Sequence, residues 1–386
     1  MGLTGGGTLA LSVVLTVLLV AATVWVWPRL AGRGWRSVLG RLGTIVATQL
    51  ALVCTLALLA NNYFSFYSSW SDLLGTGRAG PASVALGAQP GSVHGAAETP
   101  ARGAVQVLGT ETVGTAGIGV DPPERAGRLE RVRIPGAVSG LTTDGYVYLP
   151  PQYFQPAHAK DRFPVVVAMT GFPGDAKNLV TKLQYPSIAL GLIQQQKIKP
   201  MILVLMRPSP SMPRDSECED VPGGPQAETY FTADVPTDVA GSYRVQTGGR
   251  GWGAIGDSTG GYCALKLAMR NPALYTTAAS LSGYFKAAHD ITTGDLFGGS
   301  ALRRDEADLN WRLLHLPPPP VSLMLASSKQ DGGAYAEGQA FAALVRPPTT
   351  VAEATVPSGG HNFTTWVRLL PPALTWLSDH LPDPAP

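Results

Sequence analysis

The sequence predicts an α/β fold, with a mostly parallel, doubly wound sheet, preceded by two transmembrane helices. The first observation is a pair of apolar, charge-free stretches near the N-terminus, each about as long as a bilayer is thick. The second is that, after residue 125, short β-branched runs alternate with longer segments of helical spacing. The third is that only 15% of the 386 residues are charged, against about 25% in soluble domains. Part of the chain is therefore not expected to lie in water.

The two apolar stretches are residues 8–27 and 42–60. The alternative for the first stretch is a cleaved signal peptide, but such a peptide carries positive charge before its apolar core, and no charge precedes residue 29. The second stretch follows closely, which favours a hairpin of two retained helices. We therefore expect contact with membrane lipid through residues 1–70.

The short loop between these stretches sets the expected orientation. It contains four arginines, Arg29, Arg33, Arg36 and Arg41, and basic loops stay on the cytoplasmic side. The protein is then a multi-pass protein of the cell membrane, and everything after the second helix is extracytoplasmic. The aromatic residues that follow, Tyr63, Phe64, Phe66, Tyr67 and Trp70, are expected to form an interfacial belt or, alternatively, to begin a folded core.

The remaining chain divides into a linker and one large domain. Residues 71–125 are rich in Gly, Ala, Ser, Thr and Pro, and they are expected to form a flexible tether. Residues 126–386 are enough for one sizeable core and are expected to be the catalytic domain. A net charge of +2 without a Lys/Arg block argues against a nucleic-acid partner. Three cysteines are too few for a disulfide scaffold or a Cys-rich metal site.

Within the domain, hydrophobic period and run length distinguish strands from helices. Strands are expected at residues 129–134, 146–149, 163–169, 200–206, 251–255, 276–282, 321–326 and 350–356. Helices are expected at residues 178–196, 234–243, 262–270, 334–344 and 365–381. In a sheet of this kind, the chemistry lies at the carboxyl ends of the strands.

One motif carries chemistry in the right context. Residues 256–260 read Gly-Asp-Ser-Thr-Gly and fit the pattern G-x-S-x-G between an expected strand and an expected helix. Small residues on both sides let the chain turn sharply and present the hydroxyl of Ser258. A plain Gly-rich turn is the alternative interpretation.

A serine nucleophile needs a base and a carboxylate that orients the base. His361 follows the last expected strand, where the chain order serine, acid, histidine requires the base. Asp331 follows the strand at residues 321–326 and is the favoured acid, with Glu337 as the alternative. Two further carboxylates, Asp257 and Glu353, are expected at the surface.

An oxyanion hole requires two backbone N–H groups near the nucleophile. One is expected from Thr259, which directly follows Ser258. The other is expected from Phe172, in the loop after the strand at residues 163–169. An ordinary Gly/Pro turn is the alternative for that loop.

On these motifs the span from about residue 129 to residue 381 resembles the Putative esterase family of α/β-hydrolases. That family includes esterase D-like and enterochelin-esterase-like enzymes and the antigen 85 mycolyltransferases. The resemblance rests on Thr170-Gly171-Phe172, on Gly256 to Tyr262, and on Gly360-His361-Asn362-Phe363 with Trp366. This sequence departs from the family in two respects. It has Thr259 where many members carry Met, and it has an expected membrane anchor, whereas antigen 85 proteins are typically secreted.

The resemblance implies serine-dependent hydrolysis of carboxylic esters, or acyl transfer, without a metal or organic cofactor. The expected function is a membrane-anchored extracytoplasmic esterase acting on an ester or lipid-like substrate. A cell-envelope acyltransferase with the same triad is one alternative, and an inactive binding module of the same fold is another.

The cysteines add one expectation. Cys54 is expected to be a free thiol in the second membrane helix. If the domain is extracytoplasmic, Cys218 and Cys263 are free to form a disulfide beside the nucleophile helix. Two unrelated buried thiols remain the alternative.

Overall fold

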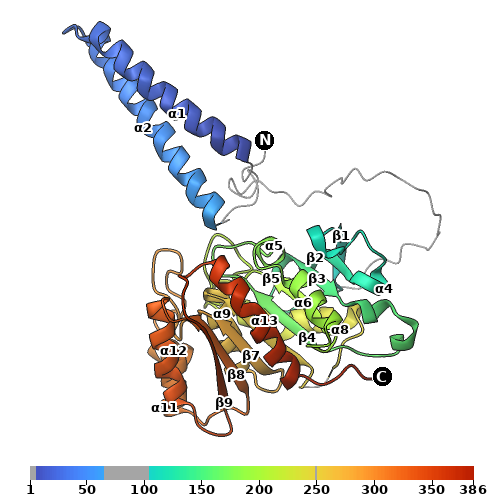
Figure 1. Cartoon of the computed structure of the whole chain (residues 1–386). Helices are drawn as coiled ribbons and strands as arrows, with labels where there is room; N and C mark the ends of the chain where they lie inside the picture. The colour runs from blue at the N-terminus through green and yellow to red at the C-terminus, as the bar shows by residue number, and fades with distance from the viewer. Residues whose placement is uncertain (1–5, 65–103, 248–249) are drawn as a thin grey trace. The chain divides into compact units, whose positions relative to one another are not determined.

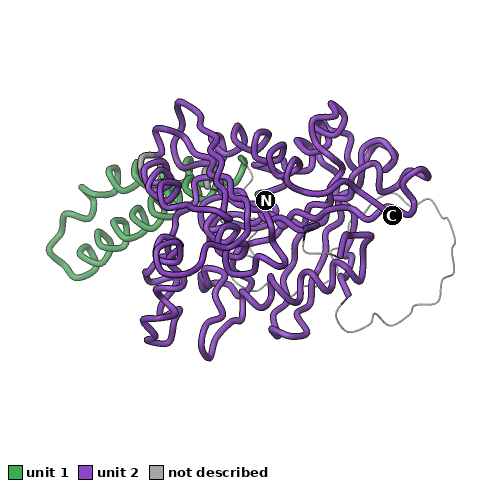
Figure 2. The backbone as a smooth tube through the Cα atoms, turned by 90° about the horizontal axis from the view of Figure 1, so that it is seen from below, with its two compact units in different colours: residues 1–84 green, residues 85–386 purple. Residues whose placement is uncertain are grey.

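The computed structural model describes residues 6–64, 104–247 and 250–386 (Figure 1). The chain divides into two compact units, residues 1–84 and 85–386 (Figure 2). The aromatic belt expected at residues 63–70 lies outside the described side chains, and most of the expected tether, residues 71–103, lies outside the described residues.

The first unit is a helical hairpin. Helix α1 (Gly6–Val26) leads through the short η1 (Trp27–Leu30) into α2 (Trp35–Phe64). Residues 6–30 and 35–62 have mean hydropathies of 2.6 and 2.1 and are long and apolar enough to cross a membrane, although a signal sequence meets the same criteria. Two hydroxyl pairs join the helices, Thr16 with Thr55 and Thr23 with Thr48, each at 2.9 Å between the oxygens. Such pairs satisfy polar groups inside an apolar environment.

The second unit is built on a nine-stranded sheet in the described residues, ordered β1-β2-β3-β5-β4-β6-β7-β8-β9. The strands are β1 (Gln106–Glu111), β2 (Arg128–Pro135), β3 (Thr142–Leu149), β4 (Val165–Met169), β5 (Ile202–Met206), β6 (Trp252–Asp257), β7 (Tyr275–Leu281), β8 (Ser322–Ser328) and β9 (Thr350–Val356). The pairs from β1 to β5 are antiparallel, and all pairs from β5 to β9 are parallel. The predicted α/β fold with a mostly parallel sheet is thereby confirmed.

Helices cover both faces of this sheet (Figure 1). The helical elements of this unit are η2 (Gly114–Ala116), α4 (Pro123–Ala126), η3 (Pro151–Phe154), η4 (Pro156–His158), α5 (Lys177–Thr181), α6 (Tyr185–Gln194), α7 (Ala227–Thr229), the π-helical η5 (Tyr230–Asp234), α8 (Val235–Ser242), α9 (Thr259–Arg270), α10 (Ala301–Ala307), α11 (Leu309–His315), α12 (Gly332–Leu344) and α13 (Phe363–His380).

The side-chain alternation of the central strands explains the two layers. Val165, Val167 and Met169 of β4 pack in the cluster that contains residues of α8, α9, α11 and α12. Val166 and Ala168 point to the opposite face and pack with α5, α6 and α13. Because successive side chains of a strand alternate between faces, a continuous apolar run is what a strand buried on both sides requires.

Two sequence-based expectations were wrong in detail. The tether does not extend to residue 125, because β1 pairs with β2 and α4 follows it. The strand lies at the sheet edge and is largely exposed, so its apolar pattern is weak. The helix expected at residues 178–196 is two helices, α5 and α6, because Gln184 has a φ of +55° and Pro186 follows in the first turn of α6.

Candidate active site

Ser258 lies at a tight turn between β6 and α9, with φ +52° and ψ −121°. The glycines on both sides of the serine are required because the neighbouring backbone leaves no room for a side chain. A Cβ on Gly256 would collide with the backbone of Gly260, and a Cβ on Gly260 would collide with the carbonyl oxygen of Met169. The Ser258 N–H donates to the carbonyl of Leu281 at 3.0 Å, which ties the turn to the end of β7. The turn thus presents the serine at the carboxyl end of a central strand.

The structure brings Ser258, His361 and Asp331 together. His361 Nε2 lies 2.9 Å from Ser258 Oγ, and His361 Nδ1 lies 3.0 Å from Asp331 Oδ2. An ionised carboxylate only accepts hydrogen bonds, so Nδ1 carries the proton and Nε2 is left to accept the serine proton. This arrangement can activate a serine hydroxyl for attack on a carbonyl carbon.

Each partner of Ser258 comes from the loop after a strand, and these two strands, β8 and β9, are neighbours in the sheet. Asp331 lies between β8 and α12, and His361 lies between β9 and α13. Trp366 of α13 supports the histidine ring from its edge, with ring centroids 4.9 Å apart at 87°. Asn362 caps α13 by accepting the Thr365 N–H at 3.1 Å, which fixes the loop that carries the histidine.

The alternative acid lies elsewhere. Glu337 is exposed on α12, inside the helix that Asp331 precedes. In the described part of the chain, Asp331 is the carboxylate that hydrogen-bonds His361, and its side chain is 11% exposed. The geometry therefore favours Asp331 as the orienting acid.

The other side of Ser258 holds the expected oxyanion donors. Outside helices and strands, the backbone hydrogen bonds of the described residues include none donated by the N–H of Phe172 or Thr259. The loop of Phe172 runs against the nucleophile, because a Cβ on Gly171 would lie 3.0 Å from Ser258 Cβ. Both N–H groups remain candidates for the expected oxyanion hole.

Asp257 is not a surface residue, contrary to the expectation from sequence. Its side chain is fully buried and accepts the Gly171 N–H at 2.9 Å through Oδ2. Burial raises the pKa of Asp257 to about 7, although the hydrogen bond from Gly171 favours the charged form. Asp257 is the last residue of β6, directly before the nucleophile. Glu353 of β9 is exposed, as expected.

A second buried carboxyl, Glu217, lies near Thr259 and was not predicted. The Tyr284 hydroxyl lies 2.7 and 2.8 Å from the two Glu217 oxygens and 3.0 Å from Thr259 Oγ1. Burial, together with the smaller effect of nearby Asp215, raises the pKa of Glu217 to about 8. The signal in the sequence was the acidic run around Cys218, in a long loop after a strand.

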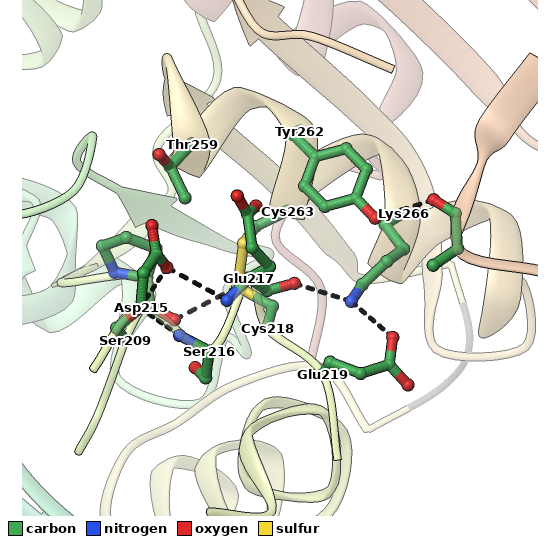
Figure 3. The surroundings of a disulfide bond; sticks show 12 residues. Ser209, Asp215, Ser216, Glu217, Cys218, Glu219, Thr259, Tyr262, Cys263 and Lys266 are labelled. Carbon is green, nitrogen blue, oxygen red and sulfur yellow. Dashed lines mark hydrogen bonds and ion pairs between the residues drawn. A yellow bond between two sulfur atoms is a disulfide. The ribbon is translucent and has the colours of Figure 1, made fainter. Parts of the chain in front are cut away.

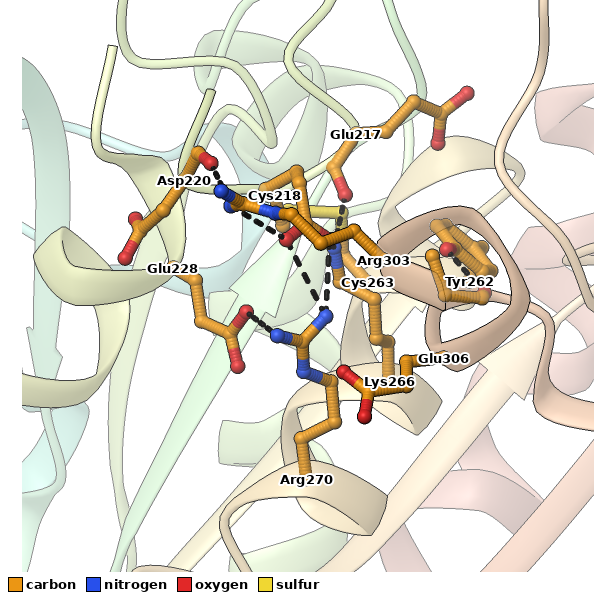
Figure 4. A network of polar contacts seen from close by, with 12 residues as sticks. Glu217, Cys218, Asp220, Glu228, Tyr262, Cys263, Lys266, Arg270, Arg303 and Glu306 are labelled. Atoms are coloured by element: carbon orange, nitrogen blue, oxygen red, sulfur yellow. Dashed lines mark hydrogen bonds and ion pairs between the residues drawn. A yellow bond between two sulfur atoms is a disulfide. The ribbon is translucent and has the colours of Figure 1, made fainter. Parts of the chain in front are cut away.

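Cys218 and Cys263 form a disulfide that joins this loop to α9 (Figure 3). Lys266 strengthens the attachment, because its fully buried Nζ donates to the Glu217 carbonyl at 2.7 Å and pairs with Glu219 at 3.0 Å. Arg270 pairs with Glu219 and Glu228, both at 3.0 Å (Figure 4). Burial alone would raise the pKa of Glu219, but Lys266 and Arg270 hold it below its usual value.

Comparison with known proteins identifies the family of this chain. A family model described as Putative esterase matches residues 139–377. The chain belongs to the Putative esterase family. Family membership supports a carboxylic ester hydrolase. In the described residues, no group of three or more His, Cys, Asp or Glu side chains is arranged to hold a metal ion.

Solved structures similar to this family member include an S-formylglutathione hydrolase from Agrobacterium tumefaciens, at 15% identity and a TM-score of 0.58, covering 72% of this chain and all of that one. A ferulic acid esterase aligns at 15% identity and a TM-score of 0.56, covering 66% and 98% of the two chains. A fluorophosphonate-binding serine hydrolase of Staphylococcus aureus aligns at 15% identity and a TM-score of 0.53, covering 65% and 98%. These likenesses support the α/β-hydrolase fold.

An uncharacterized protein of Corynebacterium glutamicum is 26% identical over 181 residues, which is 45% of this chain. The match spans 42% of that relative's length.

Proposed function

We propose that the protein is a membrane-anchored, extracytoplasmic serine esterase that acts on carboxylic esters through an acyl-enzyme. The observation that carries the proposal is the pair of hydrogen bonds from His361 to Ser258 and Asp331, at 2.9 and 3.0 Å. Membership of an esterase family supports the same chemistry.

In the first step, Ser258 Oγ attacks the ester carbonyl while His361 Nε2 takes the hydroxyl proton. Asp331 keeps Nδ1 protonated and stabilises the imidazolium. The N–H groups of Phe172 and Thr259 hold the oxyanion, each contributing about 3 kcal/mol to the stability of the transition state. The tetrahedral intermediate then collapses, and His361 returns its proton to the departing alcohol. The result is an ester of Ser258.

In the second step, water attacks this ester while His361 again accepts a proton. Collapse releases the carboxylic acid and restores Ser258. The His361 side chain is 43% exposed, which supports the access of an alcohol, in place of water, to the acyl-enzyme. This exposure is the observation behind the alternative activity, transfer of the acyl group to a cell-envelope hydroxyl by the same triad.

Activity is tested on the full chain with a fluorophosphonate probe and a panel of p-nitrophenyl esters. We expect labelling and turnover in the wild type and neither in Ser258→Ala. A folded wild type that is not labelled would instead support the inactive binding module. Adding a sugar acceptor separates hydrolysis, which yields the free acid, from transfer, which yields a new ester.

The proposed location rests on three features. They are the two apolar helices, the arginines of the loop between them, and a disulfide, which persists in oxidising compartments. All lysines of the chain follow residue 125, and Lys160 and Lys177 are exposed. A membrane-impermeant amine reagent should therefore label the domain in intact cells. Lysine labelling that requires lysis would place the domain in the cytoplasm, and N-terminal sequencing would reveal a cleaved signal peptide.

A further inference from the structure

Three side chains from distant parts of the chain meet beside the expected oxyanion hole. Tyr284 follows the end of β7, Thr259 begins α9, and Glu217 lies in the loop after β5. The tyrosine hydroxyl is within hydrogen-bond distance of both others, at 3.0 Å from Thr259 Oγ1 and 2.7 Å from Glu217 Oε1. Glu217 is fully buried, and the Ala288 N–H also donates to its Oε1 at 3.0 Å.

We propose that Glu217, through Tyr284, is a positioning residue that holds Thr259 so that its backbone N–H faces the oxyanion. The inference rests on the proposed function, in which that N–H stabilises the transition state. Glu217 itself is buried and acts through the two hydroxyls. The oxyanion donor would thus be held by side-chain contacts as well as by the first turn of α9.

Tyr284 has one hydroxyl proton, so the direction of the relay depends on the protonation state of Glu217. When Glu217 is ionised it only accepts, so Tyr284 gives it this proton and no longer donates to Thr259 Oγ1. When Glu217 is protonated it can donate to Tyr284, and Tyr284 then donates to Thr259. A glutamine at this position reproduces the second pattern, because its amide oxygen can accept from Ala288 while its NH₂ group donates to Tyr284.

Glu217 is held from several directions. Its own φ of +49° and that of Cys218, +52°, bend the loop sharply. The disulfide from Cys218 to Cys263 and the hydrogen bond from Lys266 to the Glu217 carbonyl both lead to α9 (Figure 3). Since Thr259 is the first residue of the same helix, the relay closes a ring of contacts around the start of α9.

The test compares Thr259→Val, which keeps the backbone N–H, with Tyr284→Phe, which keeps the ring stacked on Tyr262 at 5.2 Å. Each should lower kcat for p-nitrophenyl esters about tenfold with little change in KM, because the lost interaction acts in the transition state. The double variant should lose no more than either single variant, since both break one relay. Glu217→Ala should show the same loss, and Glu217→Gln should recover most of it.

Tyr275→Phe is the matched control. It removes another buried hydroxyl, bonded to the Phe231 carbonyl at 2.6 Å, at the opposite end of β7, and it should keep wild-type kcat. Wild-type kcat in folded Thr259→Val or Tyr284→Phe would overturn the relay, as would additive losses in the double variant. A wild type without any turnover would refute the proposed function instead.

Discussion

The two sides of Ser258 are built differently. On the histidine side, two loops supply His361 and Asp331, and the histidine side chain is 43% exposed. On the oxyanion side, two fully buried carboxyls lie near the expected donors. Asp257 accepts the Gly171 N–H, and Glu217 contacts the Tyr284 hydroxyl, which in turn contacts Thr259. A disulfide joins the loop of Glu217 to the nucleophile helix.

This difference matches what each side does in the proposed mechanism. The histidine must exchange protons with an entering and a leaving molecule, so access is needed. The oxyanion donors must be aligned before charge develops, because preorganised dipoles contribute most when they need not move. Substitutions on the two sides should therefore change activity and stability in different ways.

The largest effect is expected on the histidine side. Asp331→Asn should lower kcat by about 10⁴, because an amide in place of the carboxylate favours the wrong histidine tautomer. Glu337→Gln should change kcat less than tenfold, since Glu337 is exposed on α12. Ester turnover is measured on variants with matched melting curves. The reverse ranking would identify Glu337 as the acid.

An intermediate effect is expected from the disulfide on the oxyanion side. Replacing Cys218 and Cys263 by Ser should lower the free energy of unfolding by about 2–4 kcal/mol, because the bond restricts the unfolded chain. It should also lower kcat, since the loop of Glu217 loses one attachment to α9. Denaturant unfolding and ester turnover measure the two changes. Cys54→Ser, in α2, is the control, and equal stability of both proteins would contradict the expectation.

The smallest effect concerns Asp257 and pH. Its folded-state pKa of about 7 lies above the ordinary aspartate value of about 4, so the folded protein binds this proton more tightly than the unfolded chain. Its contribution to stability is therefore present below about pH 4 and is lost as pH rises toward 7.

Asp257→Asn should remove this part of the pH dependence. The melting temperature of the wild type should fall more steeply than that of the variant between pH 4 and 7, and the two curves should run parallel above it. Glu337→Gln, at an exposed position, should keep the wild-type slope. Identical slopes in wild type and Asp257→Asn would show that Asp257 titrates normally.

Local pattern was enough to predict much of this molecule. The β-branched runs predicted the buried strands, and the glycines around Ser258 predicted a turn that leaves no room for a Cβ. The order of strands and loops then led to the three residues that the structure brings together at 2.9 and 3.0 Å.

What the sequence did not reveal depends on contacts between distant residues. Tyr284 and Glu217 are separated by 67 positions, and nothing in either local sequence predicts their meeting. Asp257 was wrongly assigned to the surface. Its neighbours Gly256 and Ser258 give no sign that the carboxylate is buried and accepts a hydrogen bond from the distant Gly171 N–H. Edge strand β1 was missed because an exposed strand needs no apolar alternation.

The backbone of Ser258 has a consequence for how such a domain evolves. Its φ of +52° with ψ −121° is a conformation that glycine adopts readily and that costs other residues about 1–3 kcal/mol. Ser258→Gly should therefore yield an inactive chain that is harder to unfold than the wild type. Selection for stability alone would replace this serine, so its place at the turn reflects a trade-off in which function is kept at the expense of robustness.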